Sequence, residues 1–269
     1  MKTRIISAAI LLPIAFVILW LLPKAVCAIA IAVLCAFMAY ELLKQTELVP
    51  HNRLIVYTML AAFMVPIWSH LGMSRPWGQL GLLVFFCAVF GEMLYNHVKV
   101  RFEMIGFCFM GGILLPYLLS SIVRILDLYS GRELIAIPLI LAFLPDSGAY
   151  FIGTRYGKRK LAPTVSPKKS VEGAIAGGIT AVIGMMVYAI VMDVATDKEV
   201  SYSLALIYGV IGGVADIFGD LFFSVIKRQI GIKDYGNLIP GHGGVLDRFD
   251  SMLVVGPLTE ILIALIPVV

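Results

Sequence analysis

Nine apolar runs dominate this sequence, and each is long enough to cross a lipid bilayer as a helix, which takes about 20 residues. Lipid offers the backbone no hydrogen-bond partners, so apolar runs of this length form helices rather than loops or open strands. The whole chain is 60% hydrophobic and 14% charged, whereas soluble domains have about 25% charged residues. We therefore predict an all-α polytopic integral membrane protein with about nine transmembrane helices, at approximately 5–22, 25–43, 54–70, 77–94, 104–123, 133–153, 173–193, 203–226 and 252–269.

The positions of the cations predict how these helices are oriented. Of the 21 Lys and Arg residues, 16 fall on the side of the amino terminus, which also carries two long polar loops at 154–172 and 227–251. The positive-inside rule places this side in the cytoplasm. Without the two loops the count is 6 against 5, so the orientation depends on them. We expect an uncleaved first helix and a plasma membrane location, in a bacterium the inner membrane.

The first polar loop carries six cations and one acid, Glu172. A basic loop can simply lie against anionic lipid headgroups. Two features favour a binding site instead: Asp146 lies in the apolar run before the loop, and Lys168, Lys169 and Ser170 lead directly into the next helix. The free N–H groups at a helix amino terminus favour phosphate there.

The eighth apolar run contains two acids, although a charge at membrane depth costs roughly 2.5–3.5 kcal/mol on insertion scales. Asp216, Asp220, Ser224 and Lys227 are spaced so that they share a helical arc of roughly 80°. Two carboxylates one turn apart suit Mg²⁺, which leaves its other positions to water and substrate phosphate. A proton-relay pair in a transporter would look the same at these positions.

The loop after this helix adds groups that a proton relay does not need. Arg228 and Lys233 supply cations, while glycines 241, 243 and 244 surround His242 and let the backbone approach a phosphate. We expect Asp247 and Asp250 in the opening turn of the ninth helix, with Arg248 between them. Carboxylates, cations and a glycine-rich turn at the membrane surface indicate a metal–polyphosphate site.

These residues also resemble a known family. Ser224-Val-Ile-Lys-Arg, Lys233-Asp and the segment from Ile239 to Asp250 are similar to the signature of phosphatidate cytidylyltransferases, the CDP-diacylglycerol synthases. The upstream stretches beginning at Asp146, Leu161, Ser166 and Glu172 are similar to the same family. Phe223 stands where family members often carry an acid, and Ser170 where Thr is common.

The resemblance implies transfer of a cytidylyl group from CTP to phosphatidic acid, giving CDP-diacylglycerol and pyrophosphate, with Mg²⁺ alone or beside a second cation. It implies metal ligation by Asp220 and Asp247, with Asp216, Asp146 and Asp250 as further ligands or their supports. The triphosphate and lipid phosphate would be held by Lys227, Arg228, Lys233 and Arg248. His242 would orient a phosphate or a carboxylate, and the remaining substrate contacts would come from Lys168, Lys169, Ser170, Ser224, Gly243 and Gly244.

We accordingly divide the chain into a scaffold of helices over 1–140 and a catalytic region over 141–269, whose signature spans 224–250. The site is expected in a polar funnel that faces the cytoplasm, with membrane lipid as a partner and no nucleic acid. Glycines at 177, 178, 184, 212 and 213 predict close helix contacts, within one chain or in a homodimer. The alternatives are a cation- or proton-coupled transporter, a CDP-alcohol phosphotransferase, whose motif is absent, and a non-enzymatic scaffold.

Overall fold

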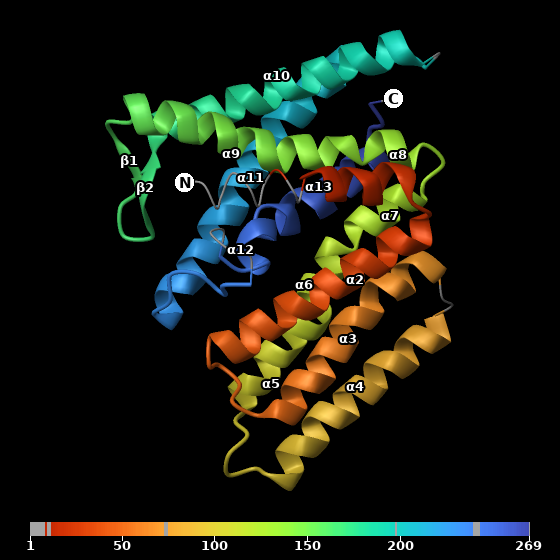
Figure 1. Cartoon of the computed structure of the whole chain (residues 1–269), viewed down its shortest axis with the longest axis vertical. Helices are drawn as coiled ribbons and strands as arrows, with labels where there is room; N and C mark the ends of the chain where they lie inside the picture. Colours follow the sequence, from red (N-terminus) through yellow and green to blue (C-terminus); the bar gives the residue numbers. More distant parts are fainter. Residues whose placement is uncertain (1–8, 10–11, 73–74, 197, 239–242, 269) are drawn as a thin grey trace. The chain divides into compact units, whose positions relative to one another are not determined.

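The computed structural model describes residue 9 and residues 12–72, 75–196, 198–238 and 243–268 (Figure 1). In this part of the chain, seven helical stretches are long and apolar enough to cross a membrane: Lys24–Gln45, Asn52–Leu71, Pro76–Tyr95, Phe102–Asp127, Gly131–Tyr156, Val171–Ala195 and Tyr202–Ile230. They match seven of the predicted runs, so the helical polytopic membrane fold is confirmed. The first predicted run lies partly outside the described residues, and the ninth forms a helix of 14 residues. The total of nine spans therefore stays a prediction.

The chain forms two compact units, and the second polar loop belongs with the amino-terminal helices. Unit 1 comprises Met1–Arg132 and Ile232–Phe249, and unit 2 comprises Glu133–Gly231 and Asp250–Val269. The predicted division at residue 140 separated scaffold from catalytic region by function. By contacts, the signature loop, here residues 232–249, belongs to unit 1, and the helix before it belongs to unit 2.

Unit 1 is built around the packing of α3 (Asn52–Leu71) against α2 (Lys24–Tyr40) and α4 (Arg75–Tyr95). Its other helices are α5 (Phe102–Phe109), α6 (Leu115–Leu119), α7 (Ser121–Asp127) and the short α12 (Leu246–Phe249). Within the described residues, π-helical segments occur at Val17–Leu21, Glu41–Gln45 and Met110–Leu114. One buried cluster of apolar side chains joins Glu41–Gln45, α3, α4 and α5, formed by Leu43, Val49, Leu54, Ile55, Phe85, Val89, Val100, Ile105 and Cys108.

Unit 2 is a bundle of helices. In it α9 (Ala136–Tyr156) packs on α10 (Val171–Ala195), α10 packs on α11 (Tyr202–Ile230), and α11 packs on α13 (Met252–Leu265). The short α8 (Gly131–Leu134) precedes α9. The helix ends follow local sequence rules: the Ser170 hydroxyl accepts the Gly173 N–H and begins α10, and Gly231, at φ 82°, ends α11.

Glycines allow the helices of unit 2 to approach one another closely, as predicted. A Cβ at Gly177 would lie 2.9 Å from the Pro145 carbonyl oxygen, so α9 and α10 meet there backbone to backbone. A Cβ at Gly213 would lie 3.1 Å from the Gly178 Cα, which shows the same closeness between α11 and α10. These contacts hold the walls of the site together.

A small antiparallel hairpin in the first polar loop is the element that the sequence did not predict. Strand β1 (Lys160–Ala162) pairs with β2 (Ser166–Ser170), and β2 runs directly into α10 (Figure 1). Glu172 holds the base of the hairpin, because its carboxylate accepts the N–H groups of Lys158 and Arg159 at 3.0 and 3.2 Å. Lys168, Lys169 and Ser170 therefore lie on a defined strand rather than on an irregular loop.

Candidate active site

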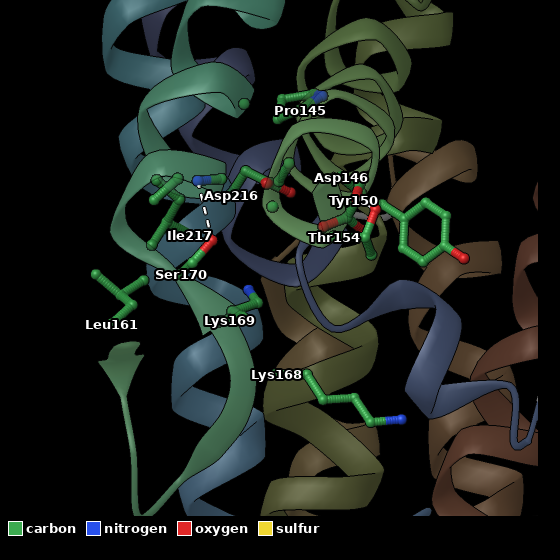
Figure 2. Close-up of a pocket in the computed structure, with 15 residues that line it drawn as sticks. Pro145, Asp146, Tyr150, Thr154, Leu161, Lys168, Lys169, Ser170, Asp216 and Ile217 are labelled. Carbon is green, nitrogen blue, oxygen red and sulfur yellow. Dashed lines mark hydrogen bonds between the residues drawn. The ribbon is translucent and has the colours of Figure 1, made fainter. Parts of the chain in front are cut away.

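A pocket of about 280 Å³ lies within unit 2, between the carboxylates of two helices and the end of the hairpin (Figure 2). Asp146 from α9 and Asp216 from α11 line it, together with Lys168, Lys169 and Ser170 from β2. The structure thus brings together five residues that the sequence predicted from three separate segments. Most of the remaining lining is apolar or glycine, which leaves the polar groups concentrated at one place.

Asp220 and Lys169 form the main ion pair beside this pocket. The Lys169 ammonium contacts the Asp220 carboxylate, and the two side chains are 24% and 23% exposed. The Ser224 hydroxyl, one turn further along α11, donates to Asp220 Oδ1 at 3.2 Å. A hydroxyl and a cation therefore hold Asp220 in place from two sides.

Asp250 extends the same group of charges. Its carboxylate lies 3.9 Å from the Lys227 ammonium, and both side chains are almost fully buried. Burial, and then the neighbouring Asp220 carboxylate, raise the pKa of Asp250 to about 7, although Lys227 acts in the opposite direction. The prediction of Asp250 in the opening turn of the last helix is wrong by a short margin, since α13 begins at Met252.

Asp216 has a buried oxygen without a hydrogen-bond partner among the described residues. This atom, Oδ1, is on a side chain that is 2% exposed, and the carboxylates of Asp146 and Asp220 act on it electrostatically. Leaving a buried polar atom unsatisfied costs about 1–3 kcal/mol. Such an atom at a pocket is available to a ligand of positive charge.

The described residues contain no ready-made cluster of three or more acidic, His or Cys side chains that would enclose a metal ion. Mg²⁺ does not require one, because it usually binds through one or two carboxylates and takes its other oxygens from water and substrate phosphate. The hard oxygen donors of Asp216 and Asp220, one of them unsatisfied, fit that chemistry.

In unit 1 the signature loop uses its carboxylate differently. Asp247 lies in α12, and not at the start of the last helix as predicted; its Oδ2 accepts the N–H groups of Tyr235 and Gly244 at 2.8 and 3.1 Å. Gly243 adopts φ 85°, a left-handed conformation that suits glycine. Asp247 thereby closes the loop onto itself.

A model of the cytidylyltransferase family matches residues 2–266 of this chain. The chain belongs to this family. Two relatives named phosphatidate cytidylyltransferase match it over nearly its whole length. The protein of Thermotoga maritima is 30% identical over 97% of this chain and 95% of its own, and that of Bacillus subtilis is 34% identical over 98% of each. The Haemophilus influenzae protein of the same name is 44% identical over 131 residues, which are 49% of this chain and 46% of its own.

Among the other residues predicted to bind phosphate in this cytidylyltransferase, Arg228 also has a structural contact. Its Nε donates to the Val165 carbonyl oxygen at 3.0 Å, which ties the end of α11 to the hairpin. Lys233 and Arg248 are exposed on the signature loop, and Lys168 is exposed at the pocket. His242 lies outside the described residues.

The sequence interpretation missed Glu41. This acid ends an apolar helix and is fully buried, and both of its carboxylate oxygens accept backbone N–H groups of the signature loop, from Val245 and Leu246, each at 2.9 Å. The signal was present in the sequence, because an acid inside a membrane-spanning stretch indicates a functional position. It was overlooked because the first 140 residues were interpreted as scaffold.

Proposed function

We propose that this cytidylyltransferase transfers the cytidylyl group of CTP to phosphatidic acid, and so forms CDP-diacylglycerol and pyrophosphate. The observation that carries the proposal is the pocket of unit 2, where carboxylates on α9 and α11 meet the lysines of β2 in an otherwise apolar helical unit. A lipid phosphate and a triphosphate both need cations, and their metal needs carboxylates. The substrate pair follows from the names of the two relatives that match over nearly their whole length.

The reaction asks for positioning and charge neutralisation more than for a base. A phosphatidic acid oxygen is already anionic near neutral pH and forms the new bond to the α-phosphorus of CTP. The bond from that phosphorus to the bridging oxygen breaks, and pyrophosphate leaves. Lys168, Lys169 and Lys227 would neutralise the phosphates, while the Ser170 hydroxyl at the start of α10 would orient one of them.

Mg²⁺ is the metal that this donor set suits. When bound, it would neutralise charge on the phosphates and stabilise the leaving pyrophosphate. Asp220 and Asp247 are the ligands that we propose, with Asp216, Asp146 and Asp250 as further ligands or their supports. A second cation could be held by the same carboxylates.

We further propose that the site faces the cytoplasm, in a polar funnel of a plasma membrane protein, because CTP is a cytoplasmic metabolite that does not cross a bilayer. Cations at both long polar loops support that orientation. The exposed apolar side of α10, which includes Ile175, Ile179 and Ile183, would contact lipid or the same helix in a homodimer.

The direct test is an assay of the purified protein with labelled CTP and phosphatidic acid. We expect labelled CDP-diacylglycerol with Mg²⁺, none after chelation by EDTA, recovery when Mg²⁺ is restored, and poor recovery with Ca²⁺, which prefers larger and more flexible sites. Cation-dependent transport by vesicles without nucleotide transfer would instead support the transporter alternative.

Single-cysteine labelling tests the orientation separately. In a variant without the four native cysteines, an impermeant thiol reagent added to intact cells should label a cysteine at position 198. Cysteines at 159 and 237 should react only after the membrane is opened, because they lie in the two polar loops. Labelling of 159 or 237 from outside would contradict the cytoplasmic site.

A further inference from the structure

We propose that Glu41 is a positioning residue for the signature loop: it fixes the turn that carries Asp247 onto the end of the apolar stretch Lys24–Gln45. This inference rests on the proposed function and adds to it a residue from the region interpreted as scaffold. Both partners of the contact, Glu41 and the turn, belong to unit 1. The argument depends on hydrogen bonds, on two glycines and on the local shape of the helix.

The hydrogen bonds show that one side chain holds two successive amides. Glu41 Oε1 accepts the N–H of Val245, and Oε2 accepts the N–H of Leu246, over more than 200 residues of sequence separation. Val245 and Leu246 begin the turn, and Asp247 is the next residue. Buried backbone donors need a partner, and here the side chain of a distant helix supplies it.

Two glycines on the loop make room for this carboxylate. A Cβ at Gly236 would lie 2.5 Å from Glu41 Oε1, and a Cβ at Gly244 would lie 2.5 Å from Glu41 Oε2. Gly236 and Gly244 do not have the left-handed φ of Gly243, so space rather than backbone conformation requires glycine there. The interpretation of Gly244 as a phosphate-binding glycine thus has an alternative: it accommodates Glu41.

The helix is widened where Glu41 lies. Glu41–Gln45 is a π-helical segment, and such segments occur frequently at functional positions. All of its first three residues, Glu41, Leu42 and Leu43, are buried. A polar contact is thus built into an apolar stretch with mean hydropathy 2.4, where a chance glutamate would be unfavourable.

Glu41 and Asp247 hold the same turn from two directions. Asp247 binds the amides of Tyr235 and Gly244 within the loop, and Glu41 binds the next two amides from the helix. Loss of Glu41 would therefore leave the loop closed on itself but no longer anchored. The expected consequence is a misplaced Asp247 rather than an unfolded protein.

Glu41→Gln is the sharpest substitution, because it keeps the size of the side chain. One oxygen becomes an NH₂ group that faces an N–H donor, so only one of the two amides keeps its acceptor. Removing the support of a metal-binding residue typically lowers activity by about 10- to 100-fold, and we expect a decrease of kcat in that range for Glu41→Gln. Glu92→Gln is the matched control: Glu92 lies in α4 of the same unit, and its carboxylate lies 3.7 Å from the guanidinium of the largely exposed Arg53.

Hydrogen exchange measures the anchoring without using activity. In Glu41→Gln, peptides that cover 243–249 should exchange faster than in the wild type, while peptides from α3 and α10 should not change. In Glu92→Gln, exchange over 243–249 should equal that of the wild type. Unchanged exchange over 243–249 in a folded Glu41→Gln variant would overturn the inference, whatever substrate the protein uses.

A double-mutant cycle with Gly244→Ala covers the case in which Glu41→Gln folds poorly. In the wild type the new methyl group would collide with the Glu41 carboxylate, so kcat should fall by about 10-fold or more. In a Glu41→Ala background the carboxylate atoms that lie nearest to this methyl group are absent. The same Gly244→Ala substitution should then lower kcat by less than about 2-fold further. Equal costs in both backgrounds would overturn the inference. If the wild type does not transfer the cytidylyl group, but Glu41→Gln still speeds hydrogen exchange over 243–249, only the proposed function is contradicted.

Discussion

The carboxylates of the two units have different kinds of partner. In unit 2, Asp220 and Asp250 face the ammonium groups of Lys169 and Lys227, and one oxygen of Asp216 has no partner among the described residues. In unit 1, Glu41 and Asp247 accept backbone N–H groups of the signature loop. The acids of this chain therefore serve both to pair with cations and to hold irregular backbone.

The difference follows from the backbone around each group. Helices α9, α10 and α11 satisfy their own amides, so their side chains are available for cations and substrate. The signature loop is irregular and partly buried, and its amides need acceptors from elsewhere. The same residue type therefore pairs with cations on a helix and accepts backbone N–H groups in the loop.

The largest expected effect is that of Asp220→Asn, which tests the unit 2 side of this comparison. The substitution keeps the shape but removes the charge that faces Lys169, so we expect a folded protein whose kcat is at least about 100-fold lower. Activity with labelled CTP, together with a thermal unfolding curve, measures both. Asp193→Asn is the control, since Asp193 lies near the end of α10 and accepts a hydrogen bond from the hydroxyl of the exposed Tyr202 at the start of α11. Normal turnover in Asp220→Asn would remove this residue from the proposed metal site.

Asp247→Asn tests whether this unit 1 acid only holds backbone amides or also binds the proposed metal. Asp247 uses one oxygen, Oδ2, for both amides, and the oxygen of an asparagine can accept the same two bonds. A purely structural Asp247 would therefore tolerate this change. We expect instead a loss of about 100-fold, because the proposed metal needs the charge. Retained activity with unchanged hydrogen exchange over 243–249 would show that Asp247 only shapes the loop.

Sequence reasoning placed the acids of α11 on one face of the helix because their positions follow a helical period. Asp216, Asp220 and Ser224 recur every four residues in an apolar run, and this spacing alone places them on one side of α11. Asp146 and Lys169 needed the fold, since only the packing of α9 and α10 brings them to the same pocket. From the sequence, only the family resemblance predicted that these segments contribute to one site.

The remaining features could not be obtained from local patterns. Glu41 and Leu246 are separated by 205 residues, and no local spacing predicts that they meet. The hairpin of β1 and β2 was hidden because its lysines and prolines are poor strand formers in isolation. Asp247 was placed in the last helix because the short α12 and its turn look like the start of that helix in sequence.

A smaller effect should separate the two lysines of the hairpin. Lys169 is half-buried and bound to Asp220, whereas Lys168 is exposed at the edge of the pocket. We expect Lys169→Gln to lower kcat by about 10- to 100-fold, and Lys168→Gln mainly to raise the KM for CTP, by less than about 10-fold. Kinetics of both variants at saturating phosphatidic acid measure this. Equal effects on kcat would mean that the ion pair with Asp220 adds nothing.

The smallest expected effect concerns the helix packing beside the unit 2 pocket. Gly177 of α10 tests this packing, and the adjacent Gly178 serves as its matched control. A Cβ at Gly177 would lie 2.9 Å from the Pro145 carbonyl oxygen, whereas a Cβ at Gly178 meets no atom within 4 Å. Alanine is intrinsically better than glycine in a helix by about 1 kcal/mol. Gly178→Ala should therefore leave thermal stability unchanged or slightly higher. Gly177→Ala should lower stability by about 1–3 kcal/mol, since it forces α9 and α10 apart at rigid backbone atoms. Because Asp146 directly follows Pro145 and lines the pocket, this displacement should also lower kcat. A Gly177→Ala variant with wild-type stability and kcat would show that the close contact of α9 and α10 does not position Asp146.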